Sequence, residues 1–456
     1  MAASALKPRD SSRLALLLLG LSLIGATCML YYHLGVFMPR VHELEAQRHL
    51  AGPYSFGNDF YPIWLTARER PRDLYGPDVT REIQLGLFGR PLDGRFSTDP
   101  LSDYRTFAYP AFTDLLCWPA AAIPFPTLRI LLAVALGVIT VFSVLLWAKM
   151  LDWQPGPVWI AVVVVLTCSS YPVIEGLYAG QMGLLVGFLL AAALFALSGE
   201  RYLLAGILMA LTLIKPQMTV LEIGFLFLWS LSNWSRRKQF IIGLFSMSAI
   251  LVVSATAVWP RWIPSWLHVL FGYHRYAKPP LLKEVLALPL GPGMSGIAGA
   301  VLIAGALAIA LALLWRHRFA PLNSSEFWLV SALLLAITTI TLLPGQAVHD
   351  HVILLPAIFL IATPQPALQS NRVWKIVLAL ALAVFVWPWL AAIGLVALRP
   401  FLSVHVFYSK PVFVLPMRTA AVFPFVVLAL LVLKYRARTG ASKMSPADLE
   451  LEMRSS

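Results

Sequence analysis

A carboxylate in the peptide GNDFYPIW, residues 57–64, is the first candidate for chemistry in this chain. Asp59 has aromatic side chains close by, among them Phe60 and Trp64. A carboxylate that aromatic neighbours partly shield from water is a better proton acceptor, so Asp59 is a candidate general base. The alternative is helix capping, because Asp59 stands just before a segment that has Pro62 in its first turn.

Lys215 is the second candidate, and it stands in the peptide IKPQ, residues 214–217, between two apolar runs. Pro216 cannot continue the hydrogen bonding of the preceding turn, which leaves carbonyl groups free at that break. A lysine at such a break can bind a phosphate group as a point charge. The alternative is an interfacial lysine that extends its ammonium group toward water.

Two further polar peptides lie at the ends of apolar segments. Gln181 in YAGQMG follows Glu175 and opens an apolar run, where it is either a site residue or simply a polar helix end. The peptide PGQAVHDH, residues 344–351, carries His349 and His351, and only these two could share a metal site. No third ligand is evident nearby, which favours a hydrogen-bonding or phosphate-contacting role for His349.

Basic residues recur near these peptides. Arg68 opens the run RERPR, residues 68–72, and could contact the same phosphate as Lys215 or pair with neighbouring carboxylates. Residues 260–293 combine basic and aromatic side chains, which is typical of a belt at the membrane surface. The second interpretation of that segment is a phosphate-binding lid over a lipid-linked substrate.

The composition indicates that these peptides belong to a polytopic α-helical membrane protein. The chain is 59% hydrophobic and 12% charged, about half the charged fraction of a soluble domain, and its mean hydropathy is +0.76. The net charge of +13 comes from short basic clusters between apolar runs, which argues against nucleic-acid binding. Eleven of the 22 Asp and Glu residues lie between Glu43 and Asp114, so one segment concentrates the carboxylates.

Other classes of site have no support in the sequence. The three cysteines show no spacing typical of a zinc site or a disulfide framework. P-loop and HExxH motifs are missing, so neither nucleotide hydrolysis nor zinc proteolysis is indicated.

The basic clusters predict a bundle of about twelve transmembrane helices with both chain ends in the cytoplasm. Residues 14–434 form one transmembrane unit between a cytoplasmic N-terminus, residues 1–13, and a cytoplasmic polar tail, residues 435–456. The large first outer loop is residues 39–126, in which the proline-marked stretch 109–124 is expected to be interfacial or re-entrant. The predicted spans are 14–38, 127–149, 156–170, 182–198, 202–215, 217–232, 239–259, 294–315, 326–343, 351–363, 374–394 and 412–434.

Several short peptides also occur in a recognisable order along the chain. They are an Asp-Phe-x-x-x-Trp peptide that begins at Asp59, LYGP at 74–77, Tyr109-Pro110, Gly180-Gln181 and IKPQ at 214–217. This order resembles glycosyltransferase family 87, the membrane transferases of the GT-C superfamily that use polyprenyl-phosphate sugars. The resemblance covers most of residues 14–363 and implies a GT-C-like helical bundle.

The resemblance also implies a reaction. The enzyme would move a hexose, often mannose, from a polyprenyl phosphate to a hydroxyl of a glycolipid, polysaccharide or glycoprotein, inverting the anomeric centre at the outer face of the cell membrane. Asp59 would act as the general base, and Lys215 would hold the leaving phosphate. No metal ion or other cofactor is implied. The further substrate-binding residues would be Gln181, His349, Arg68, Tyr109 and Gln217.

Two other classes of protein stay open. A flippase or other transporter of lipid-linked sugars needs polar residues along a path between the two faces, whereas the predicted inner loops are short and basic. A non-catalytic membrane assembly protein would bind a partner through its outer loop, and it would tolerate Asp59→Asn.

Overall fold

The fold of the chain is helical throughout its described part. The computed structural model describes residues 8–154, 156–275, 277–403 and 415–441. Within them no strand is formed beyond one isolated bridge between Pro280 and Pro344. A helix satisfies its own backbone hydrogen bonds, which a bilayer requires because it offers no water as a partner. The predicted all-α class is therefore confirmed for these residues.

Five helical segments of the described chain are long and apolar enough to cross a bilayer. They are α1 (Pro8–Tyr31), which continues through the π-helical turn η1 (Tyr32–Phe37) into α2 (Met38–Gln47), then α6 (Phe125–Met150), α12 (Trp234–Val258), the part of α14 (Leu281–Arg316) that follows Gly293, and α18 (Arg372–Leu398). The pair α7 (Pro157–Cys168) and α8 (Tyr171–Ala179) is bent by 58° and gives a sixth span if it counts as one.

The remaining apolar helices are shorter than the roughly 20 residues that a typical bilayer core requires. They are α9 (Met182–Ser198), α10 (Tyr202–Leu211), α11 (Val220–Leu231), α15 (Ser325–Thr341) and α16 (Leu355–Ala362). Helix length alone therefore supports five or six spans, and the number twelve stays a prediction. The last predicted span begins outside the described residues and continues in α20 (Leu415–Ala420) and α21 (Phe423–Ala441). Residues 1–7 and 442–456 of the predicted cytoplasmic ends also lie outside the description.

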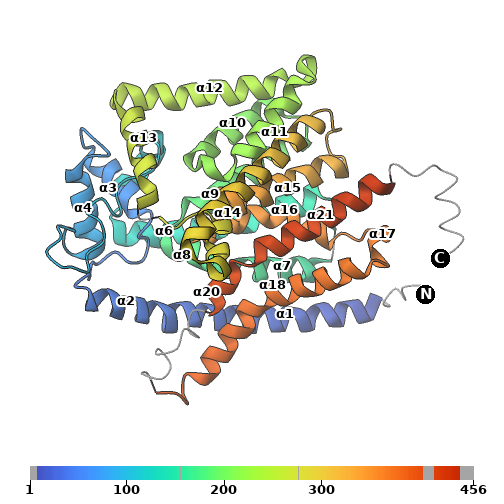
Figure 1. Ribbon diagram of the computed structural model, residues 1–456, viewed down its shortest axis with the longest axis horizontal. Helices are drawn as coiled ribbons and strands as arrows, with labels where there is room; N and C mark the ends of the chain where they lie inside the picture. The colour runs from blue at the N-terminus through green and yellow to red at the C-terminus, as the bar shows by residue number, and fades with distance from the viewer. Residues whose placement is uncertain (1–7, 155, 276, 404–414, 442–456) are drawn as a thin grey trace, which may run out of the picture.

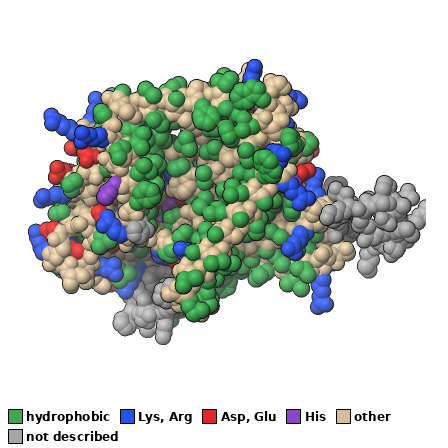
Figure 2. Space-filling model, turned by 45° about the horizontal axis from the view of Figure 1, so that its top comes forward, with side chains coloured by type: hydrophobic (Ala, Val, Ile, Leu, Met, Phe, Trp, Pro, Cys, Tyr) green, Lys and Arg blue, Asp and Glu red, His purple; other side chains and the backbone are tan. Residues whose placement is uncertain are grey.

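Charged side chains gather at two opposite ends of the molecule, with a hydrophobic surface between them (Figure 2). Residues 39–126, which the sequence predicts as the outer loop and which we call the outer segment, lie at one end, whereas the start of α1 and the end of α21 lie at the other (Figure 1). Exposed apolar side chains on the long helices, such as Leu17, Val134 and Val253, cover the surface between these ends. A protein that spans a bilayer requires this separation, because the hydrocarbon core excludes charge.

The segment between α2 and α6 folds into a compact unit. It contains α3 (Tyr61–Glu69), α4 (Pro77–Phe88), α5 (Phe112–Cys117) and the 3₁₀ helix η2 (Trp118–Ala122). Buried Gln84 organises the stretch between α4 and α5, because its amide donates to the carbonyls of Ser102 and Tyr104 and its oxygen accepts from the Leu92 N–H. The helices α5 and η2 occupy most of the predicted interfacial stretch, and each is too short to cross a bilayer.

Two glycines allow α10 and α12 to cross with their backbones in close approach. A methyl group at Gly206 would lie 2.1 Å from the Phe240 carbonyl oxygen, and one at Gly243 would lie 2.3 Å from the Leu203 carbonyl oxygen. Helices in membranes commonly pack through small residues in this way, because apolar side chains gain nothing by leaving lipid.

We expect Gly206→Ala to destabilise the protein, because the added methyl group forces α10 and α12 apart. Overpacking of this kind typically costs about 1–3 kcal/mol. The apparent melting temperature of the purified protein in detergent should fall. Gly305→Ala in α14 is the matched control, since no atom lies within 4 Å of its new methyl group. Equal melting temperatures for wild type and Gly206→Ala would contradict the close crossing.

Candidate active site

The loop that carries Asp59 is docked onto the end of α8. The Gly57 N–H donates to the Tyr178 carbonyl at 2.8 Å, and the Asp59 N–H donates to the Ala179 carbonyl at 3.0 Å. The last carbonyls of a helix have no partner within it, so the loop satisfies groups that would otherwise be unpaired. The helix ends at Gly180, where a φ of +70° favours glycine. Two segments far apart in the sequence therefore meet at Asp59.

Two side chains hold the Asp59 carboxylate. The Arg105 guanidinium donates to one oxygen, and the Gln181 side-chain amide donates to the other. The carboxylate does not cap α3, because that helix has Phe60 as its N-cap residue and no side-chain cap bond. The capping alternative is therefore wrong. With 19% of its side chain exposed, Asp59 is accessible to a ligand.

Gln181 links the Asp59 carboxylate to a buried cation. Its Nε2 donates to Asp59, and its Oε1 accepts from Lys215 Nζ at 3.1 Å. These partners fix the amide orientation, because the NH₂ group can only donate and the oxygen can only accept. The residue immediately precedes α9, and its backbone N–H donates to the Gly176 carbonyl at the end of α8. The gap between two helices thus positions the side chain.

Lys215 stands at a break between α10 and α11. The short turns η3 (Thr212–Ile214) and η4 (Pro216–Met218) flank it, and the proline that follows disfavours a helical conformation at Lys215 itself. Its buried ammonium lies 2.7 and 3.0 Å from the two carboxylate oxygens of Asp350. Gln217 lies half-buried in η4.

The 3₁₀ helix η6 (Val348–Leu354) brings His349 and Asp350 to the same cluster. His349 Nε2 lies 3.6 Å from an Asp350 oxygen, and its Nδ1 lies 4.0 Å from a Glu175 oxygen. Asp350 reaches the first turn of α9 at Gly183, where a methyl group would lie 2.0 Å from the carboxylate oxygen. The absence of a side chain at Gly183 therefore makes room for Asp350.

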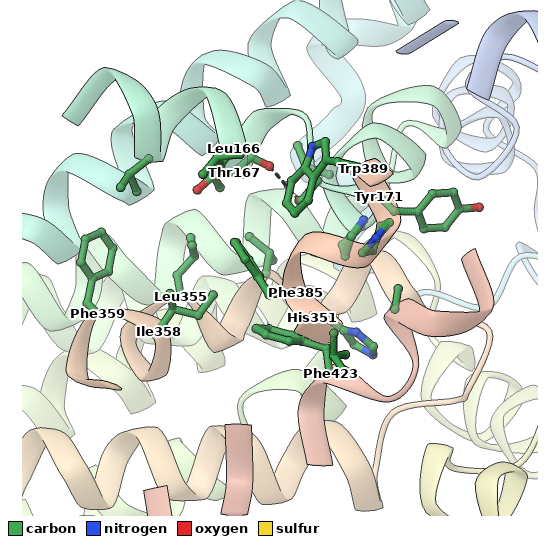
Figure 3. Close-up of a pocket in the computed structure, with 18 of the residues that line it drawn as sticks. Leu166, Thr167, Tyr171, His351, Leu355, Ile358, Phe359, Phe385, Trp389 and Phe423 are labelled. Carbon is green, nitrogen blue, oxygen red and sulfur yellow. Dashed lines mark hydrogen bonds between the residues drawn. The ribbon is translucent and has the colours of Figure 1, made fainter. Parts of the chain in front are cut away.

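His351 lies on another side of η6, where it lines an apolar cavity together with Tyr171, Trp389 and Phe423 (Figure 3). A 3₁₀ helix has three residues per turn, so side chains two positions apart diverge by about 120°. The alternative in which His349 and His351 share a metal site is therefore wrong. In the part of the chain that the structure describes, no group of three or more His, Cys, Asp or Glu side chains could hold a metal ion.

The cavity beside His351 has a volume of about 200 Å³. Its walls come from the bent pair α7 and α8, from η6 and α16, and from α18, α20 and α21 (Figure 3). Almost all of its lining side chains are apolar, and Thr167, Ser170 and His351 are among the few polar ones. Both α8 and η6 also carry charged or polar residues near Lys215, namely Glu175 in α8 and His349 and Asp350 in η6. The apolar cavity thus shares two helical elements with the charged residues around Lys215.

Two residues of the outer segment complete the cluster. Arg105, which forms the ion pair with Asp59, adopts a φ of +67° in the stretch between α4 and α5. Burial, reinforced by the charges of Asp59 and Asp350, raises the pKa of Tyr109 well above its usual range. The phenol of Tyr109 therefore stays protonated and can donate a hydrogen bond. No motif or spacing in the sequence distinguishes Arg105 from the other arginines of the outer segment.

Arg68 lies away from these residues. It stands in the last turn of α3, with its guanidinium carbon 5.2 Å from the centre of the Trp64 ring. A helix of nine residues is roughly 13 Å long, which separates Arg68 from the Asp59 loop at the other end of α3. The fold therefore brings together five of the predicted residues, Asp59, Gln181, Lys215, His349 and Tyr109. The arginine that lies beside them is Arg105, whereas the sequence predicts Arg68.

The assembled site, which we call the ionic cluster, combines an accessible carboxylate with a buried lysine and a half-buried arginine. The cations are Lys215 and Arg105, and the carboxylates are Asp59, Asp350 and Glu175. One of these carboxylates lies next to a cation of the protein, and the anionic group of a ligand could contact that same cation. This arrangement can take a proton from a hydroxyl group and stabilise a departing anion at neighbouring positions.

Comparison with known proteins identifies the family. No curated protein and no solved structure matches the chain. The model of glycosyltransferase family 87 matches residues 107–344, a stretch that includes Tyr109, Gln181 and Lys215. Asp59 precedes the matched stretch and His349 follows it. The fold places both side chains close to the site residues that the matched stretch contains. Because the match covers more than half of the chain, the protein belongs to glycosyltransferase family 87.

Proposed function

We propose that this glycosyltransferase moves a hexose, with mannose as the expected sugar, from a polyprenyl-phosphate donor to a hydroxyl of a lipid- or polymer-linked acceptor. The observation that carries the proposal is the chain of hydrogen bonds from Asp59 through Gln181 to Lys215. A transferase of this kind needs a base for the acceptor and a cation for the leaving phosphate within about one sugar ring of each other. Asp59 and Lys215 are separated by a single glutamine side chain.

Asp59 is the proposed general base. The acceptor hydroxyl loses its proton to the Asp59 carboxylate while its oxygen forms a bond to the anomeric carbon. The bond from that carbon to the phosphate oxygen breaks at the opposite face, so the anomeric centre inverts. Arg105 pairs with the carboxylate and fixes its position in the site.

Lys215 is the proposed ligand of the leaving phosphate. A phosphodiester donor carries one negative charge, and the departing polyprenyl phosphate gains a second as the glycosidic bond breaks. A buried ammonium stabilises the doubly charged leaving phosphate more strongly than the singly charged donor. This difference lowers the free-energy barrier of the transfer. Asp350 holds Lys215 in place, and Gln181, His349 and Tyr109 are placed to donate further hydrogen bonds. Gln217 would contribute from the same break as Lys215.

The apolar cavity beside η6 is the proposed place of the first isoprenoid units of the donor. The cavity adjoins the ionic cluster through α8 and η6, so a lipid phosphate at Lys215 can extend its chain into it. Its wall of α7, α16 and α18 side chains matches a hydrocarbon ligand, because burial of apolar surface is favourable at roughly 25 cal/mol per Å². The donor would thus bind with its headgroup in the charged site and its chain in the apolar one.

We place the reaction at the outer face of the cell membrane, with both chain ends in the cytoplasm. The described ends of the chain lie at one end of the molecule, and the acidic segment with Asp59 lies at the other (Figure 1). Basic clusters favour the cytoplasmic side of a bilayer, and such clusters occur near both chain ends. This orientation supports an acceptor that is exposed outside the cytoplasm.

Asp59→Asn should abolish most of the transfer, because the amide cannot accept the proton of the acceptor hydroxyl. We expect a fall of about a hundred- to ten-thousand-fold. The measurement is transfer of radiolabelled mannose from polyprenyl-phosphate mannose to extractable acceptors in membranes with equal amounts of each variant. Asp99→Asn is the matched control, since it removes another arginine-paired carboxylate of the outer segment outside the ionic cluster. Equal transfer by wild type and Asp59→Asn would contradict the base, and no transfer by wild type would favour a transporter.

Thr167→Phe should test the proposed place of the donor chain. Thr167 lines the cavity from α7, and a phenyl ring there would occupy space that an isoprenoid unit needs. We expect a higher KM for a long-chain polyprenyl-phosphate donor and little change for a donor with a very short chain. Steady-state transfer rates with the two donors provide the comparison. An unchanged KM for the long-chain donor would exclude the cavity as its binding place.

A further inference from the structure

A hollow on the outer segment lies apart from the ionic cluster. It is open to solvent, has a volume of about 570 Å³, and is formed by the end of α3 together with α5 and η2. This volume is within the range of small-ligand sites. Its lining residues are Ala67, Arg68, Arg70, Leu115, Trp118, Pro119, Ala121 and Ala122. The hollow therefore combines two guanidinium groups with an apolar wall.

The two arginines of this hollow are available to an anion. Among the described residues, the ion pairs of the outer segment engage its own Arg40, Arg90, Arg95 and Arg105 and also Arg275, and neither Arg68 nor Arg70 takes part in one.

Stacking on tryptophan rings orients both groups. The guanidinium carbon of Arg70 lies 3.8 Å from the centre of the Trp118 ring, and that of Arg68 lies 5.2 Å from the Trp64 ring. A stacked guanidinium keeps the N–H groups at its edge free for a phosphate.

The charge around the hollow fits a monoanion. Asp114 is buried beneath it in α5, and its carboxylate interacts with Arg70 through space. Burial raises the pKa of Asp114 to about 6, so this side chain is mostly ionised at neutral pH. One carboxylate against two guanidinium groups leaves one positive charge, which matches the single negative charge of a phosphodiester.

The place of the hollow in the chain indicates the membrane surface. Ala121 and Ala122 stand just before α6, one of the helices long and apolar enough to cross a bilayer. Trp118, which is 43% exposed, has the amphipathic ring that favours the headgroup region. Leu115 adds apolar surface at the same level. An occupant that is anionic at one end and apolar at the other would satisfy all of these groups.

We propose that Arg68, Arg70 and Trp118 bind the phosphate headgroup of an anionic phospholipid in the outer leaflet. The phosphodiester contacts the two guanidinium groups, and the start of the acyl chains lies against Trp118 and Leu115. The site is distinct from that of the donor phosphate, because its two arginines stand at the end of α3 and the Asp59 loop stands at the start of that helix. A single leaving phosphate cannot reach both places.

The test is lipid retention by the purified full chain in nanodiscs of phosphatidylcholine with a minor fraction of phosphatidylglycerol. Native mass spectrometry of the released protein counts the phosphatidylglycerol molecules that stay bound. We expect Arg68→Gln/Arg70→Gln to reduce this retention about tenfold or more relative to wild type. The matched control is Arg81→Gln/Arg95→Gln, which removes the same charge from exposed positions of the outer segment outside the hollow.

Three results would overturn the proposal. Retention by Arg68→Gln/Arg70→Gln at the wild-type level would exclude the hollow. An equal loss in the Arg81→Gln/Arg95→Gln control would reduce the effect to general surface charge. Displacement of the lipid by excess inorganic phosphate would show a site for the free anion instead of a lipid. The readout is binding, so the outcome does not depend on whether the protein transfers mannose.

Discussion

The side chain of Gln181 is the connection on which the site depends. Its amide donates to Asp59 from the outer segment, and its oxygen accepts from Lys215 at the break after α10. One neutral residue thus joins two ion pairs, Arg105 with Asp59 and Lys215 with Asp350. Lys215 is held in turn by Asp350 from η6, so four separate stretches of the chain converge on this connection. Its loss would separate the proposed base from the proposed phosphate ligand.

Interruptions of helices make this convergence possible inside an apolar bundle. Unpaired backbone groups are costly in a bilayer, and helix ends expose them wherever no partner is supplied. Here the end of α8 receives the N–H groups of the Asp59 loop, and glycine at 183 lets Asp350 approach the start of α9. The same short elements, α8 and η6, line the apolar cavity on another side. The charged residues of the proposed phosphate site and the apolar cavity therefore lie on the same two elements.

The site residues that the sequence predicts are those that stand where a helix is interrupted. Gly180 and Pro216 mark the ends of helices by their own conformational limits, and each lies next to a polar side chain of the ionic cluster. Arg105 could not be found in this way, because its place depends on the bonds of buried Gln84 that fix the surrounding stretch. The sequence predicts Arg68 as a phosphate contact because it lies close to Asp59 along the chain. A helix between them separates the two in space, which residue order alone does not reveal.

The most direct test is a cryo-electron microscopy structure of the full chain with a bound polyprenyl monophosphate, the product that leaves after transfer. The account predicts density for the phosphate within hydrogen-bonding distance of Lys215 and Gln181, next to Asp59. Density for the first isoprenoid units should continue into the cavity beside His351. A phosphate bound beside Arg68 and Arg70 instead, with the ionic cluster unchanged, would contradict the assignment of Lys215 and separate Asp59 from the reaction.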